Sequence, residues 1–172
     1  MEKTSEFAPL AGGCTCGEIR YRMSAAPLVV HGCHCRLCQK QTGTAFATNI
    51  LVEAEFVELT AGTVRNVTVE TPSGSGQRIA RCPTCQVAVW SEYLVMTQGI
   101  TDLVYFIRAG TLDQPEPCPP DVHIYTASKQ PWVTFPPGVP VVEEYYVTDE
   151  VWAEGSLKRR EKLRQIVKEK MA

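Results

Sequence analysis

Short apolar segments recur along most of the chain, and turns separate them. The segments are rich in β-branched and aromatic residues, which favours strands over helices. Clusters of glycine and proline, such as Gly12-Gly13 and Pro136-Pro137-Gly138, mark the connections between them. The pattern predicts an all-β domain with strands at Ile19–Met23, Leu28–Gly32, Ala45–Val52, Phe56–Thr60, Val64–Glu70, Val87–Tyr93, Leu103–Arg108, Val122–Thr126 and Val141–Val147.

The last part of the chain has a different pattern. Apolar residues recur there at helical spacing among basic ones, at Leu163, Ile166, Val167 and Met171. This pattern predicts an amphipathic helix from Ser156 onward, with Ser156 as its N-cap, and we expect its apolar side to lie on the sheet. The chain thus divides into a domain at residues 1–150 and a basic helical tail at residues 151–172.

Length and charge narrow the possible classes of protein. A chain of 172 residues can bury an apolar core without disulfides. Its net charge of −2 is uneven, because residues 151–172 carry +4 and residues 1–150 carry −6. An acidic body is a poor surface for nucleic acid, and we expect no nucleic-acid partner. Residues 1–10 contain no continuous apolar run, which predicts neither a secretory signal nor a membrane anchor and favours a cytoplasmic protein.

The eight cysteines are the main chemical signal in the sequence. In a reducing compartment, clustered thiols are more often metal ligands than disulfides. Cys118 stands alone among prolines, and we interpret it as a thiol without a function. The other seven form three short groups, at Cys14 and Cys16, at Cys33, Cys35 and Cys38, and at Cys82 and Cys85. Because a structural zinc ion takes four ligands, the seven thiols divide naturally into four and three, and we expect two zinc ions per chain.

The three-thiol group leaves a zinc ion one ligand short, and an open position is typical of catalytic zinc. The spacing alone leaves a second grouping open, in which the closed site consists of Cys14, Cys16, Cys33 and Cys35. His31 or His34 could also fill the open position, and only His31 shares the face of an extended segment with Cys33. Thiolate ligands make zinc a weak activator of water, so an open site of this kind favours binding of a small thiol over hydrolysis.

Four motifs in the chain are similar to those of a known family: Gly12-Gly-Cys14-Thr-Cys16-Gly17, His31-Gly-Cys33-His-Cys35-Arg-Leu-Cys38, Arg81-Cys82-Pro-Thr-Cys85 and His123-Ile-Tyr-Thr-Ala-Ser-Lys129-Gln-Pro131-Trp132. From about Gly12 to Tyr146 the chain resembles the glutathione-dependent formaldehyde-activating enzyme family, which also includes centromere protein V-like proteins. The resemblance implies an Mss4-like, zinc-binding β fold of irregular stacked antiparallel sheets. It implies a structural zinc on Cys14, Cys16, Cys82 and Cys85, and a catalytic zinc on Cys33, Cys35 and Cys38. The implied activity is a carbon–sulfur lyase that forms S-hydroxymethylglutathione from glutathione and formaldehyde.

Two residues depart from the pattern of that family. Gln86 stands where glycine usually follows the second cysteine pair, and a residue other than glycine has a steric cost there if its φ is positive. Gln39 stands where a basic residue is common, which removes an expected contact for the glutathione carboxylates. The remaining candidates for contacts with an anion are Arg36, Lys40 and Lys129.

Two hypotheses on function follow from these observations. In the first, a small thiol such as glutathione binds the open zinc at Cys33, Cys35 and Cys38 and adds reversibly to an aldehyde such as formaldehyde. In the second, the chain is a non-catalytic zinc module whose basic tail contacts protein or nucleic acid. Trp132 is expected in the core or in a pocket wall, and His123 is expected on a strand with its side chain bonded to backbone.

Overall fold

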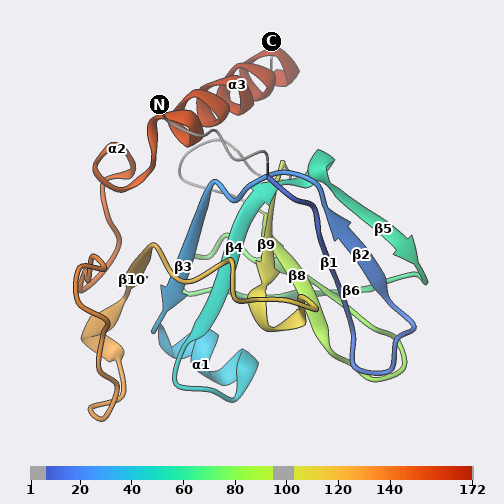
Figure 1. Cartoon of the computed structure of the whole chain (residues 1–172), viewed down its shortest axis with the longest axis horizontal. Coiled ribbons are helices and arrows are strands. Elements are labelled where there is room, and N and C mark those ends of the chain that lie inside the picture. Colours follow the sequence, from blue (N-terminus) through green and yellow to red (C-terminus); the bar gives the residue numbers. More distant parts are fainter. Residues whose placement is uncertain (1–6, 95–102, 172) are drawn as a thin grey trace.

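The computed structural model describes residues 7–94 and 103–171 and consists mainly of β-strands (Figure 1). A three-stranded sheet has the order β1-β2-β5, and a seven-stranded sheet has the order β10-β3-β4-β9-β8-β7-β6. Neighbouring strands in the described chain are antiparallel, apart from the parallel pair of β10 and β3. The strands are β1 (Leu10–Gly13), β2 (Arg20–Met23), β3 (Val29–Cys33), β4 (Ala47–Glu53), β5 (Val57–Ala61), β6 (Arg65–Val69), β7 (Gln77–Arg81), β8 (Ala88–Tyr93), β9 (Val104–Arg108) and β10 (Val122–Ile124).

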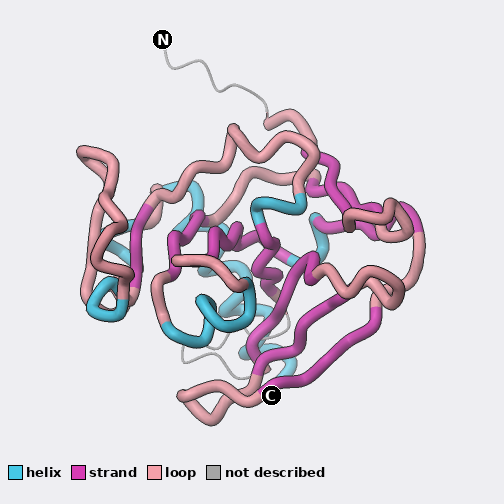
Figure 2. The backbone as a smooth tube through the Cα atoms, turned by 90° about the horizontal axis from the view of Figure 1, so that it is seen from below, coloured by secondary structure: helices cyan, strands magenta, loops and turns pink. Residues whose placement is uncertain are grey.

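The helices lie outside the sheets. In Figure 1, α3 crosses one end of the seven-stranded sheet and α1 lies near the other end, while Figure 2 shows loops around much of the periphery. None of the described helices has the length and apolar character needed to cross a membrane. The α-helices are α1 (Arg36–Thr42), α2 (Thr148–Val151) and α3 (Glu154–Met171), and short 3-10 turns occur at Ala54–Phe56, Ala109–Thr111 and Thr126–Ser128.

The predicted all-β fold with a C-terminal helix is confirmed, although two strands were missed. β1 includes Gly12 and Gly13, which the sequence analysis assigned to a turn. β7 contains mostly polar residues. Its Gln77 is only 2% exposed, and the buried Gln77 amide donates to Ser91 Oγ at 2.9 Å. Both strands lack the apolar alternation by which strands are recognised in a sequence.

The predicted strand at Val141–Val147 is wrong. The segment runs beside β10 and exchanges backbone hydrogen bonds with it, but only Val141 forms a β-bridge, opposite His123. Tyr125, directly after β10, has a φ of +55°, in the left-handed region. This conformation turns the backbone away from the strand direction, so the pairing ends after a few residues.

The C-terminal helix is present, but it begins at Glu154, two residues before the predicted start. Ser156 is buried within the first turn and is not an N-cap. The helix packs on the body through Leu163, which is 4% exposed, whereas Ile166 is 38% exposed. The apolar contact with the sheet is therefore narrower than the sequence pattern indicates.

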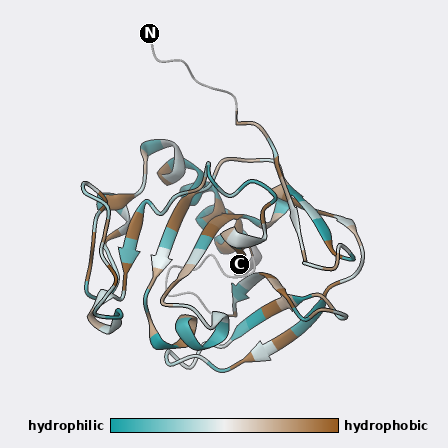
Figure 3. Ribbon diagram, turned by 60° about the horizontal axis from the view of Figure 1, so that its bottom comes forward, coloured by the Kyte–Doolittle hydropathy of each residue, from teal (hydrophilic) through white to brown (hydrophobic). Residues whose placement is uncertain are grey.

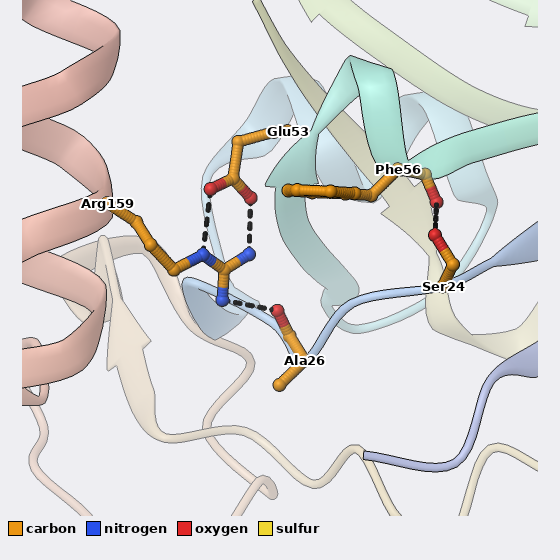
Figure 4. A network of polar contacts seen from close by, with 5 residues as sticks. All are labelled: Ser24, Ala26, Glu53, Phe56 and Arg159. Atoms are coloured by element: carbon orange, nitrogen blue, oxygen red, sulfur yellow. Dashed lines mark hydrogen bonds and ion pairs between the residues drawn. The ribbon is translucent and has the colours of Figure 1, made fainter. Parts of the chain in front are cut away.

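A buried ion pair joins α3 to the body (Figure 4). Arg159 donates through Nε and Nη2 to the two carboxylate oxygens of Glu53 at the end of β4, and through Nη1 to the carbonyl oxygen of Ala26 at 2.8 Å. Arg160, the next residue, pairs with Asp149. Two of the basic residues of the tail therefore contact the protein itself.

Alternation of side chains along the strands builds two apolar cores, one on each face of the seven-stranded sheet. On β4, Ile50 belongs to the core shared with the three-stranded sheet, and its neighbour Leu51 belongs to the other core. On β9, Ile107 and Phe106 alternate in the same way. Figure 3 shows hydrophobic residues gathered along these central strands.

Candidate metal centres and active site

The first cysteine cluster lies where two hairpins meet. Cys14 follows β1 and Cys82 follows β7, and each brings its partner of the short motif with it, so that the sulfur atoms of Cys14, Cys16, Cys82 and Cys85 lie within 4.8 Å of one another. The Sγ atom of Cys16 is 3.4 Å from that of Cys14 and 3.6 Å from that of Cys82. A tetrahedral zinc ion with Zn–S bonds of about 2.3 Å separates its sulfurs by about 3.8 Å. The four cysteines therefore fit such an ion.

Backbone groups around this cluster favour thiolates. The N–H of Ile19 donates to Cys14 Sγ at 3.2 Å, and the N–H of Cys85 donates to Cys82 Sγ at 3.4 Å. Gln86 has a φ of +62°, in the left-handed region where a residue other than glycine has a steric cost. Its side-chain amide donates to the carbonyl oxygen of Pro83 at 2.6 Å, which closes the turn that holds the two cysteines.

The second cluster lies at the carboxyl end of β3. Cys33 is the last residue of this strand, Cys35 is the N-cap of α1 and Cys38 lies in the first turns of that helix. Their three sulfur atoms lie within 4.8 Å of one another, and no described histidine, aspartate or glutamate belongs to the group. The helix α1 was not predicted from the sequence. At its start, Cys35 Sγ accepts the N–H of Cys38 at 3.3 Å. The cluster and the helix thus depend on the same local backbone.

The second cluster needs a cation to carry its full charge. Hydrogen bonds from Cys33 and Cys38 hold the pKa of Cys35 well below its usual value, and the contacts with Cys35 and Cys38 raise the pKa of Cys33. Three thiolates at this separation repel one another strongly, so the protein alone keeps only part of the group ionised. A divalent ion among the three sulfurs removes this repulsion.

The two clusters lie on opposite faces of the seven-stranded sheet. Cys14 and Cys82 belong to the core shared with the three-stranded sheet, and Cys33 and Cys38 belong to the other core. The fold therefore does not bring together the alternative group of Cys14, Cys16, Cys33 and Cys35.

Neither of the candidate histidines joins the second cluster. His31 is 2% exposed, and its Nε2 lies 2.6 Å from the hydroxyl of Tyr146. Burial lowers the pKa of His31 to about 3, which keeps the ring neutral. The ring of His34 is directed to His123 instead, with 3.0 Å between His34 Nε2 and His123 Nδ1. The expectation that His123 is bonded to backbone is thus wrong, because its side chain pairs with another histidine.

A cavity of about 420 Å³ opens beside the second cluster. Cys33 and Cys35 line it, together with His31 and the exposed Arg36. Much of the remaining wall is aromatic and comes from Tyr93, Phe106, Tyr125 and Tyr145. The cavity therefore combines thiol groups, one cationic side chain and apolar walls, which is the usual make-up of a small-molecule site.

Of the candidate anion contacts, only Arg36 lines this cavity. Lys40 is exposed and Lys129 donates to the carbonyl oxygen of Val133 at 3.2 Å, and neither lines the cavity. Gln39, the departure from the family pattern, is 9% exposed and faces the protein interior. Its amide nitrogen donates to the carbonyl oxygens of His34 and Ser128, and its amide oxygen accepts from Arg36 and Gln130.

Two further residues lie away from the site. Trp132 is 72% exposed, so its expected place in the core or in a pocket wall is wrong. It follows Pro131 in an exposed turn, and Phe135 packs against the His34 ring at 5.4 Å between centroids. Cys118 is 3% exposed in the first core and belongs to neither cluster.

The aromatic wall was not foreseen from the sequence. Tyr125 and Tyr145 come from the irregular segments after β10, and Tyr93 and Phe106 come from adjacent strands. No local pattern connects these residues, and only the pairing of β8 with β9 brings the latter two together.

The chain is thus a β protein with two cysteine clusters that could each hold a metal ion, and the cluster of three lies at a cavity. The sequence profile of the family described as "Glutathione-dependent formaldehyde-activating enzyme" matches residues 9–128, which include both clusters. The chain belongs to this family.

Comparisons with other proteins add a solved structure. No curated protein matches the chain. The similar solved structures include the crystal structure of a protein from Rhodobacter sphaeroides, which is 13% identical to this chain. The similarity covers 60% of this chain and 88% of that chain, with a TM-score of 0.43.

Proposed function

We propose that the chain is a zinc-dependent carbon–sulfur lyase that binds a small thiol, such as glutathione, and adds it reversibly to an aldehyde such as formaldehyde. The observation that carries this proposal is the set of three sulfurs, from Cys33, Cys35 and Cys38, beside a cavity of about 420 Å³ in a chain of this family. The four-sulfur cluster, Cys14, Cys16, Cys82 and Cys85, is proposed to hold a second, structural zinc.

The sulfurs of Cys33, Cys35 and Cys38 would hold the zinc, and Cys33 and Cys35 also line the cavity. When bound there, zinc supplies a cation that keeps an incoming thiol ionised at neutral pH. Arg36 is the charged side chain available in the cavity wall for a carboxylate of the thiol substrate. The aromatic walls supply apolar surface beside the cysteine sulfurs.

The reaction forms one carbon–sulfur bond. The sulfur electron pair of the thiolate attacks the aldehyde carbon, and the electron pair of the C=O π bond moves to oxygen. The proton released by the thiol is taken up by this oxygen in the product, so the reaction needs no oxidant or reductant. In the reverse direction the hydroxyl proton leaves, the C–S bond breaks and thiol and aldehyde are released.

The test is exchange spectroscopy by NMR on mixtures of glutathione and formaldehyde with the zinc-loaded protein. We expect exchange between free glutathione and its hydroxymethyl adduct to be faster than without protein. Cys35→Ser should abolish the acceleration, and Cys118→Ala, which removes a buried thiol outside both clusters, should retain it. If the wild-type protein neither accelerates exchange nor binds glutathione, the proposed reaction is wrong.

Metal analysis separates this enzyme from a non-catalytic zinc module. We expect two zinc ions per chain, one of which takes up glutathione sulfur, as detected by X-ray absorption at the zinc edge. One zinc per chain, or two with no change on addition of glutathione, would favour the module.

A further inference from the structure

A chain of buried hydrogen bonds leads from α2 to the cavity. Trp152, the C-cap of α2, donates its indole Nε1–H to the hydroxyl oxygen of Tyr146 at 2.7 Å. The same hydroxyl lies 2.6 Å from His31 Nε2. All three side chains are buried, with 7%, 8% and 2% of Trp152, Tyr146 and His31 exposed.

The direction of this chain follows from its donors. An indole N–H can only donate, so the Tyr146 oxygen accepts from Trp152 and has its own proton left to donate. The Tyr145 side chain also interacts with this hydroxyl, but the acceptor at hydrogen-bond distance is His31 Nε2, 2.6 Å away. His31 Nε2 is therefore an acceptor, and the proton of the neutral ring lies on Nδ1.

The second ring nitrogen of His31 has a different environment from Nε2. No residue in the described ranges, 7–94 and 103–171, forms a hydrogen bond with His31 Nδ1. Unlike His34 Nδ1, this nitrogen is not fully buried. The ring therefore keeps solvent contact at Nδ1, and the cavity is the space that it lines.

The position of His31 relates this N–H to the cysteine cluster. His31 and Cys33 lie two residues apart on β3, so their side chains point to the same face, with about 7 Å between their Cα atoms. Both line the cavity. Asn49, which pairs with His31 on β4, lines it too, but its amide oxygen already accepts from Arg108.

We propose that His31 donates its Nδ1–H to the oxygen of the aldehyde or of its thiol adduct, and that Tyr146 and Trp152 are positioning residues that hold this tautomer. Negative charge grows on that oxygen as sulfur attacks carbon, and a donor held in place by buried hydrogen bonds stabilises it. The identity of the oxygen rests on the proposed function, whereas the tautomer does not. Tyr146 and Trp152 lie after residue 128, outside the part of the chain that the family profile matches.

The tautomer can be measured directly. The chain has three histidines, so long-range ¹H–¹⁵N spectra of the zinc-loaded, histidine-labelled protein contain three ring systems, and His31→Gln assigns one of them. We expect a protonated Nδ1 and an unprotonated Nε2 for His31. Tyr146→Phe removes only the hydroxyl and should convert a large part of the ring population to the Nε2–H form. Tyr21→Phe, the matched control, removes a hydroxyl that contacts Thr111 in the other core and should leave the tautomer unchanged.

Trp152→Phe tests the chain from its other end, and it should shift the tautomer in the same direction and to a smaller extent. A wild-type ring with its proton on Nε2 would overturn the assignment. The assignment would also fail if Tyr146→Phe, folded by circular dichroism, kept the Nδ1–H form in full.

Substrate binding is tested on the same signal. Glutathione together with formaldehyde should shift the His31 Nδ1–H resonance, and glutathione alone should shift it less. In exchange kinetics, His31→Gln should lower kcat about 100-fold, with the glutathione Kd within about two-fold of the wild type. Equal shifts in both mixtures, or an unchanged kcat, would refute the contact with oxygen. Absence of exchange activity in the wild type would refute the proposed function, while the tautomer result still decides the roles of Tyr146 and Trp152.

Discussion

Replacing Arg159 by methionine tests how the C-terminal helix is joined to the body. Methionine keeps much of the apolar stem of the side chain but removes the guanidinium group. The change deletes the two bonds to Glu53 and the bond to the carbonyl oxygen of Ala26, as well as the contact of the guanidinium with the Phe56 ring. The carboxylate of Glu53, with 3% of the residue exposed, is left without a cation.

The burial of the pair sets the magnitude of the effect. Removing one partner of a buried ion pair costs about 3–5 kcal/mol, because the remaining charge stays desolvated. Since 26% of the Arg159 side chain is exposed, water can reach part of the vacated space, and we expect a loss at the lower end, about 3 kcal/mol. For a chain of this length that loss lowers Tm by about 6–12 °C.

The assay is urea unfolding of the zinc-saturated protein at constant free zinc, because bound metal also contributes to stability. Lys158→Met is the matched control, since Lys158 lies on the same helix in an ion pair with Glu154 whose side chains are 73% and 81% exposed. We expect its effect to stay below about 0.5 kcal/mol. A loss of less than about 1 kcal/mol in Arg159→Met would refute the reasoning. So would a double variant with Glu53→Gln that recovers none of the loss.

Three further predictions concern the turns and the cysteine clusters. Gln86→Gly should raise the free energy of unfolding by about 0.5 kcal/mol, because glycine adopts a φ of +62° without steric cost and this gain exceeds the loss of the exposed hydrogen bond to Pro83; a decrease in the same urea titration would contradict this. Gln39→Ala should lower that free energy by about 2–3 kcal/mol, because it leaves buried polar groups unpaired, and a loss below about 1 kcal/mol would count against it. Cys14→Ser should lower Tm more than Cys33→Ser does, and it should also lower the zinc content. The reason is that the first cluster connects hairpins far apart in sequence, whereas the second closes only a short loop. Equal melting temperatures in differential scanning calorimetry would argue against that difference.

The strands were predictable where apolar side chains cover one or both faces of the segment. Ile50 and Leu51 on β4 alternate between two cores, and both leave a strong apolar signal in the sequence. β7 left no such signal, because Gln77 is buried through hydrogen bonds with other side chains. The helix α1 was missed for another reason. It is seven residues long and its N-cap is Cys35, a residue type that seldom caps helices.

The cysteines could be recognised from their spacing, whereas their grouping depends on the sheet. Cys14 and Cys33 are close in sequence, yet they lie in different cores because β3 and the three-stranded sheet place them on opposite faces. The reasoning from alternation on β3 gave the correct face for His31. It could not supply Tyr146 as the partner of His31, since 115 residues separate the two in sequence.

The place of Gln39 changes what its departure from the family pattern means for substrate recognition. From the sequence, a missing cation at this position removes a contact for the carboxylates of glutathione. In the fold, the Gln39 side chain faces inward, and its amide oxygen accepts from Arg36 Nη1 at 3.1 Å. Arg36 is the cation that lines the cavity, so under the proposed function Gln39 would act on anion binding by orienting Arg36 and not by charge of its own. Recognition of a carboxylate in this chain is therefore expected to depend on Arg36, and the identity of residue 39 matters through the hydrogen bond that holds it.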